Sequence, residues 1–225
     1  MKGYNPANNN QQNTPIQVDK RSAYHHAGHA AAIYLGNKQK QLPVVHFQML
    51  IKEQGVINGE VASHVKGAKA KRIVKIEGGR LIQSLPLLKT DTMEDLSIFE
   101  RQEYRLAYEA DIVNILAGPL AEAKYVALRE NKIFNPNLVY LGALKFYGGR
   151  AKLNLINEYL DCVLSYGEER DHKLAELFLS AYSFINNQLN WHSINALVAH
   201  ILEYRKEILD CNEVIALLES SRLAA

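Results

Sequence analysis

Apolar side chains recur every three or four positions along most of the chain, and this spacing predicts a largely helical protein. Helices are expected over about 20–35, 93–131, 153–164, 169–187, 191–208 and 211–219. Asp19 is placed to cap the first helix, which we expect to end near Gly36 and Asn37. Gly118 and Pro119 predict a kink or a new helix start, because proline removes one helical hydrogen bond.

A β-rich stretch follows the first predicted helix. Residues 44–51 and 56–65 are expected to form two strands joined by a short turn, and 72–76 a third strand. Residues 1–17 are polar and asparagine-rich, which predicts a disordered arm. We therefore expect an α+β fold, mainly α-helical, in a single domain over 18–220 with a small β-subdomain at about 42–80 on the N-terminal side.

Composition narrows the function classes. The chain has 225 residues, 48% of them hydrophobic, and a formal net charge of +2, which does not favour nucleic acid or membrane as a partner. Only two cysteines are present, Cys162 and Cys211, and no Cys-x-x-Cys pair, so neither a disulfide scaffold nor a thiolate zinc site is expected. The sequence shows neither a secretory signal nor an apolar run long enough to span a membrane, so a cytoplasmic protein is expected.

Two histidines carry the strongest chemical signal. His25 and His29 lie four positions apart on a predicted helix, so their imidazoles project from nearly one face. This is the arrangement by which two imidazoles hold one zinc ion in H-E-x-x-H peptidases. The alternative is a pair of packed or solvated histidines without a metal.

The residues around this pair extend the pattern. The segment AYHHAGHA at 23–30 resembles the A-Y-H-E-A-G-H-A helix of the FtsH-type zinc metalloproteases. Residues 115–122 resemble the helix of that family that carries an apolar-Gly-x-x-Ala-Glu motif. Residues 142–164 resemble its glycine turn and third-ligand helix, and 191–214 its C-terminal helices. The resemblance spans about 19–219 and implies a zinc-metallopeptidase-like helical domain, with His25 and His29 as the metal pair. Glu122 is implied either as a hydrogen-bond partner of a histidine ring or as a surface residue.

Two departures from the family pattern bear on activity. His26 stands where the family has the glutamate that acts as general base, and Lys152 stands where apolar spacing places the aspartate that is the third zinc ligand. A protonated lysine has no lone pair to donate and repels a dication. We therefore expect zinc to bind weakly or not at all. His26 is the remaining candidate for a catalytic base or a third ligand.

Three hypotheses about the function follow. The first is a degenerate metallopeptidase-like protein without conventional proteolysis that binds a peptide or a protein partner. The second is an active zinc-dependent metalloendopeptidase with an unusual site, and the third is a structural protein with packed histidines. The chain has no G-x-x-x-x-G-K-[ST] motif, so it lacks the ATPase module of the FtsH family. The sequence leaves the oligomeric state open.

Overall fold

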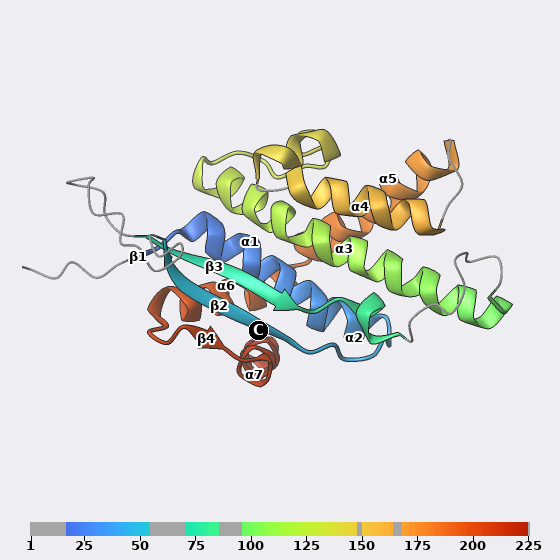
Figure 1. The fold of residues 1–225 in the computed structure, drawn as a ribbon. Helices are drawn as coiled ribbons and strands as arrows, with labels where there is room; N and C mark the ends of the chain where they lie inside the picture. Colours follow the sequence, from blue (N-terminus) through green and yellow to red (C-terminus); the bar gives the residue numbers. More distant parts are fainter. Residues whose placement is uncertain (1–16, 55–70, 86–95, 148–149, 164–167, 225) are drawn as a thin grey trace, which may run out of the picture.

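The computed structural model describes residues 17–54, 71–85, 96–147, 150–163 and 168–224 (Figure 1). The helices are α1 (Lys20–Ala31), α2 (Asn37–Gln39), α3 (Ile98–Arg129), α4 (Arg150–Val163), α5 (Glu168–Asn186), α6 (Gln188–Glu203) and α7 (Cys211–Leu223). The strands are β1 (Gln17–Val18), β2 (Phe47–Gln54), β3 (Lys71–Gly78) and β4 (Ile208–Leu209). The fold is therefore α+β and mainly α-helical, as the sequence predicts.

The sheet has the order β1-β3-β2-β4. Strand β2 pairs with β3 in antiparallel fashion along its whole length, from Phe47 opposite Gly78 to Gln54 opposite Lys71. Strand β1 pairs with β3 only at Lys71 and Arg72, and β4 pairs with β2 only at Met49 and Leu50. Because β1 and β4 come from outside 42–80, the sheet is not confined to the predicted subdomain.

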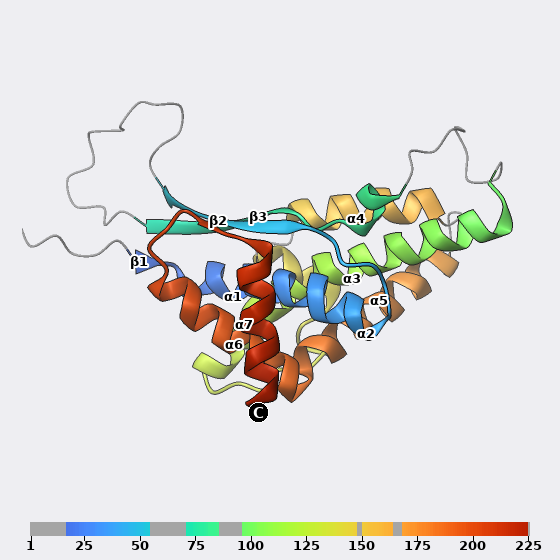
Figure 2. The ribbon, with the colours of Figure 1, turned by 90° about the horizontal axis from the view of Figure 1, so that it is seen from below.

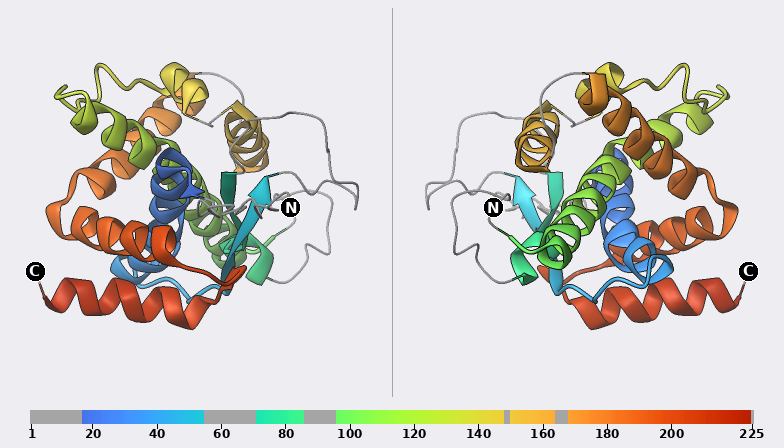
Figure 3. Two further views of the ribbon diagram at one scale, coloured as in Figure 1. Left: turned by 90° about the vertical axis from the view of Figure 1, so that its left-hand side faces the viewer. Right: turned by 90° about the vertical axis from the view of Figure 1, so that its right-hand side faces the viewer.

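Helix α1 lies in the middle of the molecule, with helices and strands on several sides of it (Figures 2 and 3). Its alanines at 23, 27, 30 and 31 are fully buried, which lets neighbouring elements approach closely. A Cβ atom on Gly28 would lie only 2.5 Å from Ala121 Cβ and 2.8 Å from Ala117 O, both on α3. Glycine at this position therefore sets the contact between α1 and α3.

Helix α3 runs without interruption through Pro119, so the predicted alternative of a new helix start is wrong. An interior proline costs about 3 kcal/mol or more in an isolated helix. Here the residues from Ala110 to Lys124 are all buried against neighbouring elements. Tertiary packing thus holds the helix together where the local signal favours a break.

Three other predicted boundaries need correction. The first helical segment continues through a π-helical turn at Ala32–Gly36 into α2, because Asn37 is buried and accepts a hydrogen bond from Asn114. The helix expected over 191–208 ends at Glu203, and β4 occupies 208–209. Gln17, assigned to the arm, belongs to β1.

Several expectations concern residues outside the described ranges, namely the arm over 1–16 and the strand over 56–65. The cap at Asp19 is confirmed, since its side chain accepts from Arg21 N–H. Among the described residues, no helix is both long and apolar enough to cross a membrane.

Candidate functional site

His25 and His29 lie side by side, both buried, on the face of α1 that contacts α3. Their Nε2 atoms are 3.2 Å apart. The ring of His29 rests directly on α3, because a Cβ atom on Gly118 would lie 2.4 Å from its Nε2 atom. The glycine at 28 therefore lets α1 approach α3 closely, and the glycine at 118 leaves room for the His29 ring between the two helices.

The outer nitrogen of each ring is already bonded. His25 Nδ1 lies 3.1 Å from Glu122 Oε2, and His29 Nδ1 lies 2.7 Å from the carbonyl oxygen of Asn114. A carboxylate and a carbonyl both accept, so each Nδ1 carries its proton and donates it. If both rings were neutral, two Nε2 lone pairs would face each other. A proton or a metal cation between these two atoms would relieve this repulsion.

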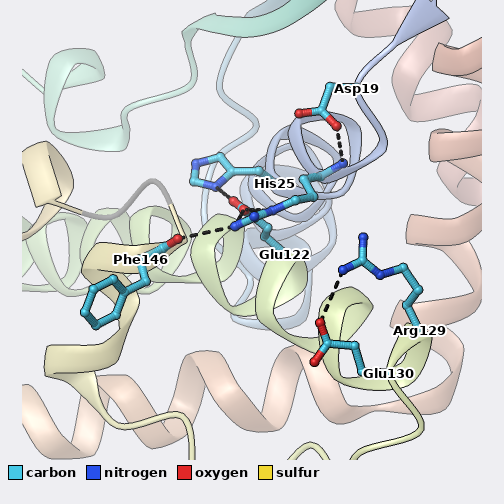
Figure 4. A network of polar contacts seen from close by, with 7 residues as sticks. Asp19, His25, Glu122, Arg129, Glu130 and Phe146 are labelled. Atoms are coloured by element: carbon cyan, nitrogen blue, oxygen red, sulfur yellow. Dashed lines mark hydrogen bonds and ion pairs between the residues drawn. The ribbon is translucent and has the colours of Figure 1, made fainter.

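Glu122 is buried at the centre of a polar network that joins α1 to α3 (Figure 4). Its Oε1 accepts from Arg21 Nε at 2.8 Å, while its Oε2 accepts from His25. Arg21 also donates to the carbonyl oxygen of Phe146, at 3.3 Å. Of the two roles considered for Glu122, the structure places it as the hydrogen-bond partner of a histidine ring.

His26 projects away from this network. Its ring centroid lies 5.0 Å from that of His25 and 6.1 Å from that of His29. Burial, followed by the charges of His25 and Lys152, lowers the pKa of His26 to about 3. Its Nδ1 atom is buried and has no hydrogen-bond partner in the described part of the chain. A base this weak removes a proton poorly at neutral pH.

A cavity of about 420 Å³ opens beside His26 and His29. Its walls come from α1, β3, α3 and α4, together with the turn that follows β3. Apolar side chains line part of it: Ile33, Ile76, Ile115 and Leu155. Charged residues line the rest: Lys75, Glu77, Arg80, Asp111 and Lys152. A cavity of this size holds a few amino-acid side chains.

Lys152 lines this cavity from the first turn of α4. Its charge contributes to the lowered pKa of His29, after burial and the charge of His25, so it lies on the same side as the predicted site. Burial and then the neighbouring Arg80 charge lower the pKa of Lys152 itself. The five residues singled out from the sequence, at 25, 26, 29, 122 and 152, therefore gather around one pair of rings.

Sequence reasoning did not identify Asp111 and Asn114 on α3. Asp111 lies on the cavity wall and accepts from the backbone N–H groups of Leu81 and Ile82, at 2.8 and 3.0 Å. Burial raises its pKa to about 6, although these two bonds and the Arg80 charge oppose the shift. The available signal was an acidic residue inside the apolar run from Ala110 to Val113.

The residues present fit part of a zinc site only. Two nitrogen ligands about 2.0–2.1 Å from a tetrahedral zinc lie roughly 3.3 Å apart, which matches the two Nε2 atoms. Within the described ranges, however, no three His, Cys, Asp or Glu side chains form a group that could hold a metal. Lys152, which lines the same cavity, carries an ammonium that has no lone pair to offer a metal. The spacing of the two histidine Nε2 atoms therefore suits zinc, but the described residues do not supply the three protein ligands of a catalytic zinc site.

The chain was compared with protein-family models, with curated proteins and with solved structures. None of the three comparisons gave a match.

Proposed function

We propose that this chain is a degenerate relative of the FtsH-type peptidase domains that binds extended peptides and does not cleave them. The observation that carries this proposal is the cavity beside β3, in which two histidines face a lysine. The cavity retains space for a substrate. The groups needed to activate water are incomplete.

The chemical argument concerns the general base. In a zinc peptidase a carboxylate takes the proton of the attacking water, and such a base typically contributes about 10²–10⁴-fold in rate. His26, with a pKa of about 3, does not replace it. Asp111 has a suitable pKa of about 6, but both of its oxygens are engaged by backbone N–H groups.

The binding argument concerns the exposed edge of β3. Gly79 N–H donates to His46 O, so alternation along an antiparallel ladder directs the backbone groups of Lys75 and Glu77 toward β2. Those of Ile76 and Gly78 then point to the opposite side. On this side β1 pairs with Lys71 and Arg72, and Ser22 of α1 accepts from Val74 N–H at 3.4 Å, so the stretch considered for a peptide begins at Ile76. An extended peptide can add to such an edge through main-chain hydrogen bonds.

Two measurements test the absence of proteolysis. Protein purified without chelating resin is expected to retain little zinc after dialysis, and no hydrolysis of casein is expected. The alternative, an active zinc metalloendopeptidase with His25 and His29 as ligands, is favoured by the 3.2 Å separation of the two Nε2 atoms. Near-stoichiometric zinc, with chelator-sensitive cleavage that disappears in His25→Ala, would establish that alternative and overturn the proposal.

Peptide binding is tested with an immobilised chain and a random pool of N-acetylated, C-amidated octapeptides that lacks aspartate and glutamate. We expect the parent chain to retain peptides from this pool. Ile76→Pro should abolish retention, because proline removes an edge N–H. Val44→Pro, outside the sheet at a residue with 70% of its surface exposed, serves as the control. Equal retention by both variants would contradict binding at the β3 edge.

A further inference from the structure

The charges around the cavity do not cancel. Lys152 is half-buried, and among the described residues no carboxylate pairs with its ammonium. After burial, the like charge of Arg80 is the second cause that lowers the pKa of Lys152. Two cations therefore face the same space, and one of them has lost part of its hydration without gaining a partner. This arrangement is unfavourable for the protein alone.

The acidic residues of the cavity are occupied by other groups. Glu77 accepts from Lys75 at 3.1 Å and from Gln48 at 3.3 Å. Asp111 accepts two backbone N–H groups of the turn after β3. On the cavity wall, Lys75 pairs with Glu77 and the charge of Arg80 acts on Asp111, whereas no carboxylate of the described chain pairs with Lys152.

Two further features of this side bear on the chemistry of a ligand. The buried Nδ1 atom of His26, on the same wall, has no partner in the described ranges. Lys152 and Leu155 stand in the first two turns of α4, where the helix dipole is positive and favours an anion. Apolar side chains of Ile33, Ile115 and Leu155 lie beside these groups. An anion attached to an apolar chain fits this combination better than a free inorganic ion does.

We propose that the cavity binds a carboxylate of the bound peptide, with Lys152 as its counter-ion and Arg80 beside it. The carboxylate is either the C-terminus of the peptide or the side chain of an aspartate or glutamate. This inference rests on the proposed peptide-binding function and names the ligand chemistry of the site. The lysine that prevents a full zinc ligand set thereby has a role of its own, because it changes the preference of the site from a cation to an anion.

The experiment uses the full chain and three pools of N-acetylated octapeptides at one ionic strength. The first pool is amidated and free of acidic residues, the second has a free C-terminal carboxylate, and the third is amidated and contains glutamate. Charge-assisted hydrogen bonds are stronger than neutral ones, so we expect one of the two acidic pools to bind about tenfold more tightly than the neutral pool. The acidic pool that binds more tightly identifies the source of the carboxylate.

Variants separate the role of Lys152 from general electrostatics. Lys152→Met should remove the preference for acidic pools, so that the three pools bind alike, and Lys152→Arg should keep the preference. Lys145→Met, an exposed lysine outside the cavity, should change nothing. Lys152→Met should also unfold at the same or a higher temperature than the parent, because it removes an unpaired half-buried charge.

The outcomes distinguish the two proposals. Equal binding of all three pools by the parent, or an acidic preference that survives Lys152→Met, overturns the carboxylate site and leaves peptide binding intact. No binding of any pool overturns the proposed function and this inference together.

Discussion

The two sides of the histidine pair differ in how completely their polar groups are bonded. On the side of α3, Glu122 joins Arg21 to His25, and the carbonyl oxygen of Asn114 accepts from His29. On the side of the cavity, His26 Nδ1 and the Lys152 ammonium lack partners in the described chain. Adjacent residues of one helix therefore stand in opposite environments.

This difference separates what the fold needs from what a ligand can use. A buried polar group without a partner costs roughly 1–3 kcal/mol, so a side that serves only stability is expected to be fully bonded. On the side of α3, the Nδ1 atoms of both rings and both oxygens of Glu122 have partners. On the cavity side, the missing partners are the reason to expect a ligand. The predictions below test one side or the other, from the largest expected effect to the smallest.

The double variant His26→Glu with Lys152→Asp should create a metal site on the cavity side of the histidine pair. It adds an acidic ligand and a general base to two Nε2 atoms already 3.2 Å apart. We expect zinc affinity to rise by at least about 100-fold, measured by competition with a chromogenic chelator. The same double variant carrying His25→Ala should lose the gain. An unchanged affinity would show that residue 152 does not reach the third-ligand position.

Asp111 should make stability depend on pH. Its pKa rises on folding from 3.8 to about 6, so between these values the folded state holds a proton that the unfolded state has released. The stabilisation is complete below pH 3.8 and is lost as pH rises through about 6. The loss is on the order of 3 kcal/mol, since one pKa unit corresponds to about 1.4 kcal/mol. Urea unfolding from pH 4 to 7 should show this fall in the free energy of unfolding in the parent and not in Asp111→Asn. Parallel pH dependences for the two proteins would contradict the prediction.

Glu122→Ala should disrupt the hydrogen-bond network on the side of the histidine pair that contacts α3. It leaves the buried Nδ1 of His25 without an acceptor, and we expect a loss of about 2 kcal/mol in the free energy of unfolding. Glu130→Ala is the matched control, because Glu130 pairs at the surface with Arg129 (Figure 4) and also with Lys132. Exposed ion pairs are screened by solvent, so this control should change the free energy of unfolding little. Equal losses in the two variants would mean that burial of the Glu122 network does not matter.

Gly28→Ala tests the packing that brings the two helices together. The new methyl group would lie 2.5 Å from Ala121 Cβ, and overpacking of this kind costs about 1–3 kcal/mol. Alanine recovers about 1 kcal/mol of helix propensity, so a net loss of about 1 kcal/mol is expected in thermal or urea unfolding. Gly36→Ala, whose Cβ would meet its nearest atom at 3.7 Å, should instead be neutral or stabilising. A gain in stability in both variants would mean that α1 and α3 lie further apart than in the structure.

Most of the helices and the histidine pair could be predicted from the sequence, because the patterns that indicate them are local. Apolar spacing predicted α1, α3, α4, α5 and α7, and Asp19 was recognised as the cap of α1. The spacing of His25 and His29 placed both rings on one helix face. Lys152 was assigned to the same site from the resemblance of its helix to the third-ligand helix of the FtsH family, and it lines the cavity that His26 and His29 also line.

What the sequence could not decide depends on contacts between distant segments. The continuity of α3 through Pro119 and of the first helical segment through Gly36 follows from burial, which outweighs local propensity. The partners of the two histidine rings, at 114 and 122, lie 85 and 97 positions away along the chain. The raised pKa of Asp111 likewise arises from burial that only the packed helices create. Residue spacing thus determined which groups share a face, and tertiary packing decided which of them are bonded and which remain open to a ligand.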